Sequence, residues 1–278
     1  MITLQSYAKI NIGLRILGRR PEDGYHLLET IFQEVDLADV IRIETRKRRG
    51  TFGERFSMSC DDPAIPCDGK NLIMQAIDTM MPFLPQDLGL NIRLQKRIPV
   101  GAGLGGGSSN AAAILRWLNR EAGLQENELS ALAVRIGADV PFFLHGGTAY
   151  ATGIGEVLRP IGIPKSWFAV LVFPGIGIST AWAYGQLRNS LTAKPKKAII
   201  PSQLENEFSW QIFENDFEKA IIPSYPEIGS IKERLYESGV SYAGLSGSGS
   251  TVFGVCETCD AAERVAAAFV NAKVVRPL

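Results

Sequence analysis

Alternating apolar and polar residues predict β-strands in three parts of the first hundred residues. Residues 2–17, 39–46 and 91–100 alternate in this way, with the period of two that a half-buried strand shows. Turn-forming residues occupy 19–25 (RRPEDGY), where they predict a connection between the first two strands.

Apolar residues with helical spacing, together with helix-ending residues, predict the helices. Residues 71–81 have that spacing and stop before Pro82, and residues 126–136 are closed by Gly137. A glycine run leads into Ser108-Ser109-Asn110. These three are good N-cap residues, and they predict the start of an alanine-rich helix that extends to about residue 119. The other predicted elements are a buried strand at 167–173, a helix opened by Ser179-Thr180, a loop at 194–197, a helix at 228–237, and a strand, glycine turn and strand at 242–255.

Glycine and proline residues interrupt the pattern between positions 153 and 164 and predict a domain boundary there. The chain has 278 residues, a length that accommodates two domains of ordinary size. We therefore expect an N-terminal domain over residues 1–160 and a C-terminal domain over residues 161–278.

Acidic and basic residues number 29 each, so the formal net charge of the chain is zero. Long-range attraction to nucleic acid or to an anionic membrane is therefore not its organising principle. The longest apolar runs, such as 167–173, are far shorter than the ~20 residues of a membrane span, and the N-terminus lacks the continuous apolar core of a signal peptide. The sequence predicts a cytoplasmic protein that binds neither nucleic acid nor membranes.

Two of the four cysteines, Cys256 and Cys259, form a C-x-x-C pair, which is found in redox pairs and in zinc sites. A zinc site would need two further ligands, and the chain has only two histidines. We expect instead a strand end that continues into a helix, with both cysteines acting as small packing residues.

Five glycines between positions 101 and 107 precede the predicted helix start. Glycine lets the backbone approach a ligand closely and adopt positive φ, and the free amides at a helix start favour an anion. The hydroxyls of Ser108 and Ser109 could reach a phosphate oxygen or a magnesium ion. This segment therefore predicts a phosphate-binding loop rather than a turn that only lets the helix pack.

Three nucleotide-binding classes fit this loop poorly. Gly101, Gly103 and Gly106 satisfy G-x-G-x-x-G, but the preceding strand alternates apolar and charged residues, whereas the first strand of a dinucleotide-binding fold is buried on both faces. No glycine–lysine pair is followed by serine or threonine, as a Walker loop requires. The protein-kinase strings H-R-D and D-F-G are absent as well.

With Pro99 in front, the string PVGAGLGGGSSNAA resembles the phosphate loop of the GHMP kinases. Ala8-Lys9-Ile10-Asn11 and the string GLSGSGSTVFG at 244–254 are similar to the two other motifs of that family. Three motifs in the family's order are more specific than one glycine pattern. The resemblance implies a two-domain α+β fold, with an N-terminal domain like ribosomal protein S5 domain 2 and a ferredoxin-like C-terminal domain.

Longer strings narrow the resemblance to one branch of the family, notably AKINIGLRILGRRPEDGYHLLETIFQEVDLAD, IGADVPFFLHGG and NDFE. That branch uses ATP to phosphorylate the 2-hydroxyl of a cytidine diphosphate-linked methylerythritol in the non-mevalonate route to isoprenoid precursors. The resemblance implies ATP and Mg²⁺ as cofactors and this small molecule as the partner, and it leaves the choice between monomer and homodimer open. It implies no role for the NDFE string at 215–218.

The resemblance assigns the chemistry to Asp139 and Lys9. Asp139 follows a helix end, where an aspartate ordinarily caps or turns the chain, but the family uses it as the general base for the acceptor hydroxyl. A lysine on an alternating strand is usually solvated; the resemblance points Lys9 inward beside Asp139, where its charge offsets developing negative charge. Asn11 shares the strand face of Lys9 and would position the substrate.

The resemblance also implies a site for the cytosine ring. Tyr25 and His26 would supply a stacking ring and hydrogen bonds to the pyrimidine, and Tyr184 would stack as the second aromatic residue. The remaining substrate contacts that it implies are Thr180, Gly247 and Ser248.

On the nucleotide side, the glycine loop would hold the ATP phosphates, and Asn71 and Lys96 would lie near the adenine. The Ser108 hydroxyl would be a ligand of the Mg²⁺ that phosphoryl transfer requires. The ATP-binding residues that the resemblance implies are Asn71, Lys96, Pro99, Gly101, Gly103, Leu104, Gly105, Gly106, Gly107, Ser108 and Ser109.

Three alternatives remain to be distinguished. A homoserine or mevalonate kinase of the same family has a substrate without a base for Tyr25, His26 and Tyr184 to contact. A nicotinamide-dependent oxidoreductase would quench NAD(P)H fluorescence without binding ATP. A catalytically silent binding protein does not need both Lys9 and Asp139.

Overall fold

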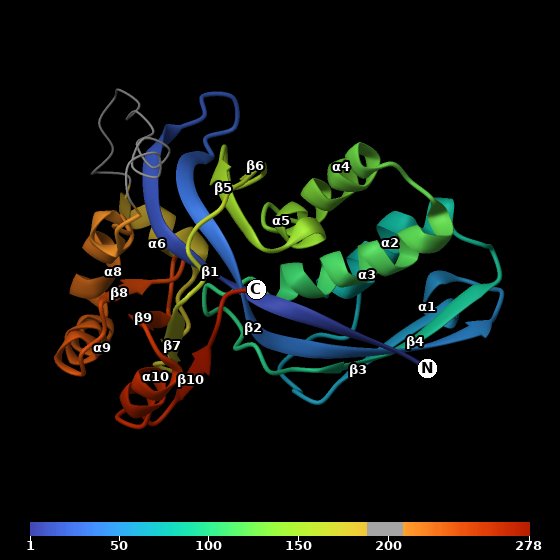
Figure 1. Cartoon of the computed structure of the whole chain (residues 1–278). Coiled ribbons are helices and arrows are strands. Elements are labelled where there is room, and N and C mark those ends of the chain that lie inside the picture. Colours follow the sequence, from blue (N-terminus) through green and yellow to red (C-terminus); the bar gives the residue numbers. More distant parts are fainter. Residues whose placement is uncertain (188–207) are drawn as a thin grey trace. The chain divides into compact units, whose positions relative to one another are not determined.

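The computed structural model describes residues 1–187 and 208–278, which form two compact units. Unit 1 consists of Met1–Ala8, Leu37–Val100 and Gly105–His145, and unit 2 of Lys9–Asp36, Gly101–Leu104 and Gly146–Leu278. The units interleave along the chain, since β1 (Ile2–Arg19) and β2 (His26–Lys47) each contribute residues to both (Figure 1). The predicted boundary at residue 160 stays a prediction, and the loop at 194–197 lies outside the described residues.

The sheet of unit 1 is built on the C-terminal half of β2. β4 (Leu88–Gln95) pairs antiparallel with it, with Ile43 opposite Ile92, and β3 (Phe56–Cys60) runs parallel along the other edge of β4. The strands predicted at 2–17 and 39–46 are confirmed. The strand predicted at 91–100 ends too late, because β4 stops at Gln95 and the next three backbone amides bond to the side chains of Asp61 and Asp39 instead of to a strand.

Four helices pack with one another in unit 1 (Figure 1). They are α2 (Leu72–Met80), α3 (Gly106–Ala122), α4 (Glu126–Ile136) and α5 (Val140–His145), accompanied by the short turns α1 (Phe52–Arg55) and η1 (Met81–Phe83). The prediction that Ser108-Ser109-Asn110 caps α3 is wrong, because the N-cap is Gly105. Asn110 lies inside the helix with its side chain buried.

The second sheet lies in unit 2, with the strand order β10-β7-β9-β8 and every neighbouring pair antiparallel (Figure 1). Its strands are β7 (Phe168–Val172), β8 (Tyr242–Leu245), β9 (Val252–Cys256) and β10 (Ala272–Val275), and its helices are α6 (Thr180–Gln186), η3 (Trp210–Ile212), α8 (Glu218–Ser224), α9 (Pro226–Glu237) and α10 (Cys259–Ala266). Val170, Phe217, Leu235 and Val252 are among the buried residues of its core. β5 (Thr148–Thr152) pairs with the N-terminal half of β2 and with β6 (Val157–Pro160).

The first part of β2 was not predicted as a strand. It begins at His26, directly after the predicted turn, but residues 28–33 are buried without interruption. A strand covered on both faces does not alternate, so its sequence (LETIFQ) lacks the period of two.

The C-x-x-C pair has the structure expected from the sequence. Cys256 ends β9 and Cys259 begins α10, and both are free thiols. Burial raises the pKa of the Cys256 thiol, which keeps it protonated and unreactive at neutral pH.

Among the described residues, no helix combines the length and the apolar character that crossing a bilayer requires.

Candidate active site

The glycine loop has a backbone that only glycine adopts easily. Gly101 and Gly103 have φ angles of 63° and 76°, in the left-handed region. At Gly103 space is limiting as well, since a Cβ atom there would lie 2.0 Å from the carbonyl oxygen of Ser246. The loop therefore contacts the glycine turn of residues 246–251, which joins β8 to β9, backbone against backbone.

The start of α3 is suited to bind an anion. Its N-cap, Gly105, has no side chain, and no side-chain cap bonds to the first turn. The helix has 17 residues, so its amides and its dipole both favour negative charge at this end. Leu104 and Ser109 are buried, whereas Ser108 is half-buried; of the two serines, Ser108 is the more exposed.

The turn that carries Asp139 adjoins this helix start within unit 1. Asp139 is half-buried and stands between Gly137, which ends α4, and the first residue of α5. A Cβ atom on Gly137 would lie 3.9 Å from the Ser108 hydroxyl oxygen, so the turn that carries Asp139 adjoins the first turn of α3. A carboxylate and a hydroxyl thus accompany the anion-binding amides.

Lys9 is buried in unit 2, with 4% of its surface exposed. Its ammonium group donates to Asn11 Oδ1 at 2.5 Å and to the carbonyl oxygen of Gly103 at 2.9 Å, and it lies 5.2 Å from the centre of the Phe32 ring. The side chain therefore points inward, as the resemblance implied. The predicted partnership of Lys9 with Asp139 stays a prediction.

Asn11 contacts both Lys9 and the glycine turn of residues 246–251, which is called the late glycine turn below. Its Nδ2 donates to Thr30 Oγ1 at 3.0 Å, and its backbone amide donates to Ser246 Oγ at 3.2 Å. Ser246 Oγ in turn donates to the Gly103 carbonyl at 2.9 Å. Both polar groups of the Asn11 side chain thus have protein partners, and these contacts position the lysine.

Two of the three residues predicted for the cytosine site, His26 and Tyr184, are brought together in unit 2. The His26 and Tyr184 rings stack with centroids 4.7 Å apart and an angle of 22° between them, and Phe217 meets Tyr184 edge-on at 4.9 Å. Tyr25 is 58% exposed and lies beside Arg20. One face of Tyr184 is therefore covered by His26 in this structure.

The NDFE string, which had no role in the sequence interpretation, holds the late glycine turn. Asn215 Nδ2 donates to the carbonyl oxygens of Leu245 and Gly247, both at 2.8 Å, and Glu218 Oε1 accepts from the Leu245 amide at 2.9 Å. The turn also carries Ser248, whose hydroxyl lies 3.0 Å from that of Thr180.

The two residues predicted near the adenine already have protein partners. Asn71 is the N-cap of α2; its Oδ1 accepts from the Ile73 amide, and its Nδ2 donates to the Pro66 carbonyl. The Lys96 ammonium is bonded to Asp39 at 2.8 Å. A contact of either residue with adenine stays a prediction.

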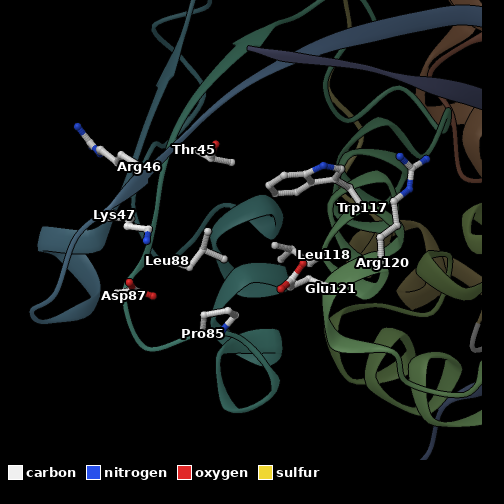
Figure 2. A pocket seen from close by; sticks show the side chains of 10 residues that line it. All are labelled: Thr45, Arg46, Lys47, Pro85, Asp87, Leu88, Trp117, Leu118, Arg120 and Glu121. Atoms are coloured by element: carbon white, nitrogen blue, oxygen red, sulfur yellow. The ribbon is translucent and has the colours of Figure 1, made fainter.

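A cavity of about 490 Å³ lies at the other end of α3 (Figure 2). Trp117 and Leu118 face Leu88 and Pro85 across it. Trp117 follows Gly106 by eleven residues, which is about 16 Å along a helix. This cavity is therefore separate from the anion-binding end of α3.

Comparisons with known proteins match this arrangement. Residues 71–147 match the N-terminal domain of GHMP kinases and residues 200–275 match the C-terminal one. A 4-diphosphocytidyl-2-C-methyl-D-erythritol kinase of Prosthecochloris aestuarii is 42% identical over 95% of this chain and 92% of its own length, and that of Geobacter sulfurreducens is 42% identical over 95% and 93%.

Two solved structures are similar over nearly the whole chain. A crystal structure of 4-(cytidine 5'-diphospho)-2C-methyl-D-erythritol kinase matches with a TM-score of 0.80 and 34% identity, covering 99% of both chains. A homoserine kinase from Cytophaga hutchinsonii matches with a TM-score of 0.71 and 18% identity, covering 99% of this chain and 94% of its own; at that identity the likeness concerns the fold alone.

Proposed function

The chain belongs to the GHMP kinase family, and from that premise we propose that it transfers the γ-phosphoryl group of ATP to the 2-hydroxyl of 4-diphosphocytidyl-2-C-methyl-D-erythritol. This reaction belongs to the non-mevalonate synthesis of isoprenoid precursors. The observation that carries the proposal is the identity of about 40% over most of the chain with kinases of that substrate. The fold confirms the α+β, two-domain GHMP architecture.

The glycine loop and the start of α3 would hold the ATP phosphates. Amides that point at a phosphate need no side-chain movement when the nucleotide binds, and the helix dipole adds to their attraction. Ser108 would contribute its hydroxyl to the same phosphates.

Asp139 would act as the general base, and the position of its turn, in which Gly137 adjoins Ser108 of α3, supports this role. Its carboxylate accepts the proton of the 2-hydroxyl while that oxygen bonds to the γ-phosphorus. The bond between the γ-phosphorus and the ADP oxygen breaks, and ADP leaves. Lys9, fixed by Asn11 and the Gly103 carbonyl, would offset the negative charge of this step.

We propose that Mg²⁺ assists, and the oxygen donors of this region fit it. The Ser108 hydroxyl is a hard ligand of the kind that Mg²⁺ prefers. Within residues 1–187 and 208–278, no three His, Cys, Asp or Glu side chains are grouped to hold a metal ion, so most ligands would be ATP oxygens and water. When bound, the ion would neutralise charge on the phosphates.

Tyr184→Ala should raise the KM for the cytidine substrate about tenfold and leave the KM for ATP unchanged. Removing the ring abolishes stacking on the base, which is worth about 1–3 kcal/mol. Steady-state kinetics with each substrate varied in turn measures both constants. Tyr184→Phe keeps the ring and is the control; an unchanged KM in the alanine variant would contradict the stacking role.

We further propose that the enzyme works in the cytoplasm, as a monomer or homodimer. Its proposed substrates, ATP and a nucleotide-linked alcohol, are polar metabolites of that compartment. Sedimentation of the purified chain would distinguish the two assembly states.

The test of the proposed function is ADP release with four alcohols: the cytidine diphosphate-linked methylerythritol, homoserine, mevalonate and galactose. We expect turnover with the first alone, because only that substrate carries a base for the aromatic residues. Turnover with homoserine or mevalonate instead would assign the chain to another branch of the family.

A further inference from the structure

Asp39 is a fully buried aspartate with four hydrogen bonds, all within unit 1. Its side chain is 0% exposed. Oδ1 accepts from the backbone amides of Arg97 and Ile98 at 2.7 and 2.8 Å. Oδ2 accepts from Lys96 Nζ at 2.8 Å and from Asn110 Nδ2 at 3.0 Å.

These four donors lie on both sides of the glycine loop. Lys96, Arg97 and Ile98 precede the loop in sequence, and Asn110 follows it, in the second turn of α3. One carboxylate therefore joins the two ends of the loop. Nothing in the sequence interpretation pointed to Asp39, because its partners are 57 to 71 residues away along the chain.

A second set of contacts brings this network up to the loop itself. Lys96 Nζ also donates to the Ile98 carbonyl, and Asn110 Nδ2 also donates to Ser6 Oγ at 2.6 Å. A Cβ atom on Gly106 would lie 3.1 Å from Lys96 Nζ and 3.0 Å from the Ile98 side chain. The first residue of α3 thus rests directly on the ion pair.

We propose that Asp39 is a positioning residue for ATP: it holds both ends of the glycine loop so that the amides of the first turn of α3 are in place before the nucleotide binds. The inference rests on the proposed ATP site and adds a residue to it that touches neither substrate. Amides fixed in advance need no ordering on binding, and this raises affinity.

The two carboxylate oxygens of Asp39 have different partners, so substitutions can affect the link to the strand end and the link to α3 separately. Asp39→Asn can keep Oδ1 as the acceptor for the two backbone amides, but it places an NH₂ group against the Lys96 ammonium and the Asn110 amide. The variant therefore weakens the link to α3 more than the link to the strand end. Asn110→Ala removes the α3 link, together with the Asn110–Ser6 bond, and leaves the buried Asp39–Lys96 ion pair intact.

The test is the KM for ATP, together with the Kd for ADP from calorimetric titration. We expect both constants to rise about tenfold in Asn110→Ala, the effect of one lost hydrogen bond to a charged group, and by at least as much in Asp39→Asn, which disrupts the bonds from both Lys96 and Asn110. The KM for the cytidine substrate should stay within about twofold. Asp61→Asn is the control, because Asp61 accepts from the Lys96 amide at 2.8 Å but is exposed.

An unchanged KM for ATP and an unchanged Kd for ADP in Asn110→Ala would overturn the proposal. Equal increases in the KM values of both substrates, together with a lowered Tm, would also overturn it, because they indicate a merely structural role. If Asp39→Asn does not fold, Asn110→Ala decides. The ADP titration needs no turnover, so this inference and the proposed function can fail independently. If the enzyme phosphorylated a different alcohol, the proposed function would fail, but the Kd for ADP could still be measured in each variant.

Discussion

Asp139→Asn should lower kcat by about 10²–10⁴-fold and leave the affinity for ATP nearly intact. The amide cannot accept the proton of the acceptor hydroxyl, so the loss falls on the chemical step and not on nucleotide binding. Turnover at saturating ATP and cytidine substrate, combined with an ATP titration, separates the two effects. Asp139→Ala should show a similar loss of turnover.

The asparagine variant also distinguishes catalysis from helix capping. Asp139 directly precedes α5, and asparagine caps a helix about as well as aspartate does. If capping were its only role, Asp139→Asn would retain nearly normal turnover while Asp139→Ala lost stability, and Asp139 would leave the mechanism. Asp78→Asn is a suitable control, since Asp78 is an exposed residue of α2.

Gly103→Ala should lower kcat/KM for ATP by about 10²-fold or more and reduce the Tm. The new methyl group would meet the Ser246 carbonyl at 2.0 Å, and neither backbone can move without shifting the Lys9 and Ser246 contacts to the Gly103 carbonyl. A displacement of about 1 Å at a reaction centre is enough for a loss of this size. Steady-state kinetics and thermal melts provide both measurements.

Gly101→Ala is a matched control for this substitution. Gly101 also has positive φ, so alanine there carries a similar backbone strain of about 1–2 kcal/mol. Nothing lies within 4 Å of its Cβ position, so no clash is added. Equal losses of kcat/KM in the two variants would mean that backbone strain alone causes the loss and that the close contact of Gly103 with Ser246 adds nothing to it.

The phosphate loop could be recognised from the sequence because its chemistry is local. Glycines that free the backbone and amides that open a helix are consecutive residues, so their spacing along the chain is also their spacing in the site. The exact start of α3 could not be read in this way, because Ser108-Ser109-Asn110 has the composition of a cap. Asn110 instead lies inside the helix, where its side-chain amide donates to the buried residues Ser6 and Asp39. No local pattern reveals these partners.

The strand content was predictable only where one face is exposed. Within the strand predicted at 39–46, residues 41–44 alternate between buried and exposed, as a strand with one solvated face does. Residues 28–33 of the same strand are covered on both sides and lose the alternation that would have identified them.

By itself, the sequence determined the family, the α+β class and the anion-binding loop, since these depend on runs of neighbouring residues. Only the tertiary structure decided that Lys9 is buried against Asn11 and Gly103, that Asp39 joins the two ends of the loop, and that Asn215 holds the late glycine turn. Each of these polar groups is stabilised away from water by hydrogen bonds, and apart from the neighbouring Asn11 the partners are 30 to 94 residues distant along the chain. Such pairings are properties of the folded chain and have no signature in local sequence.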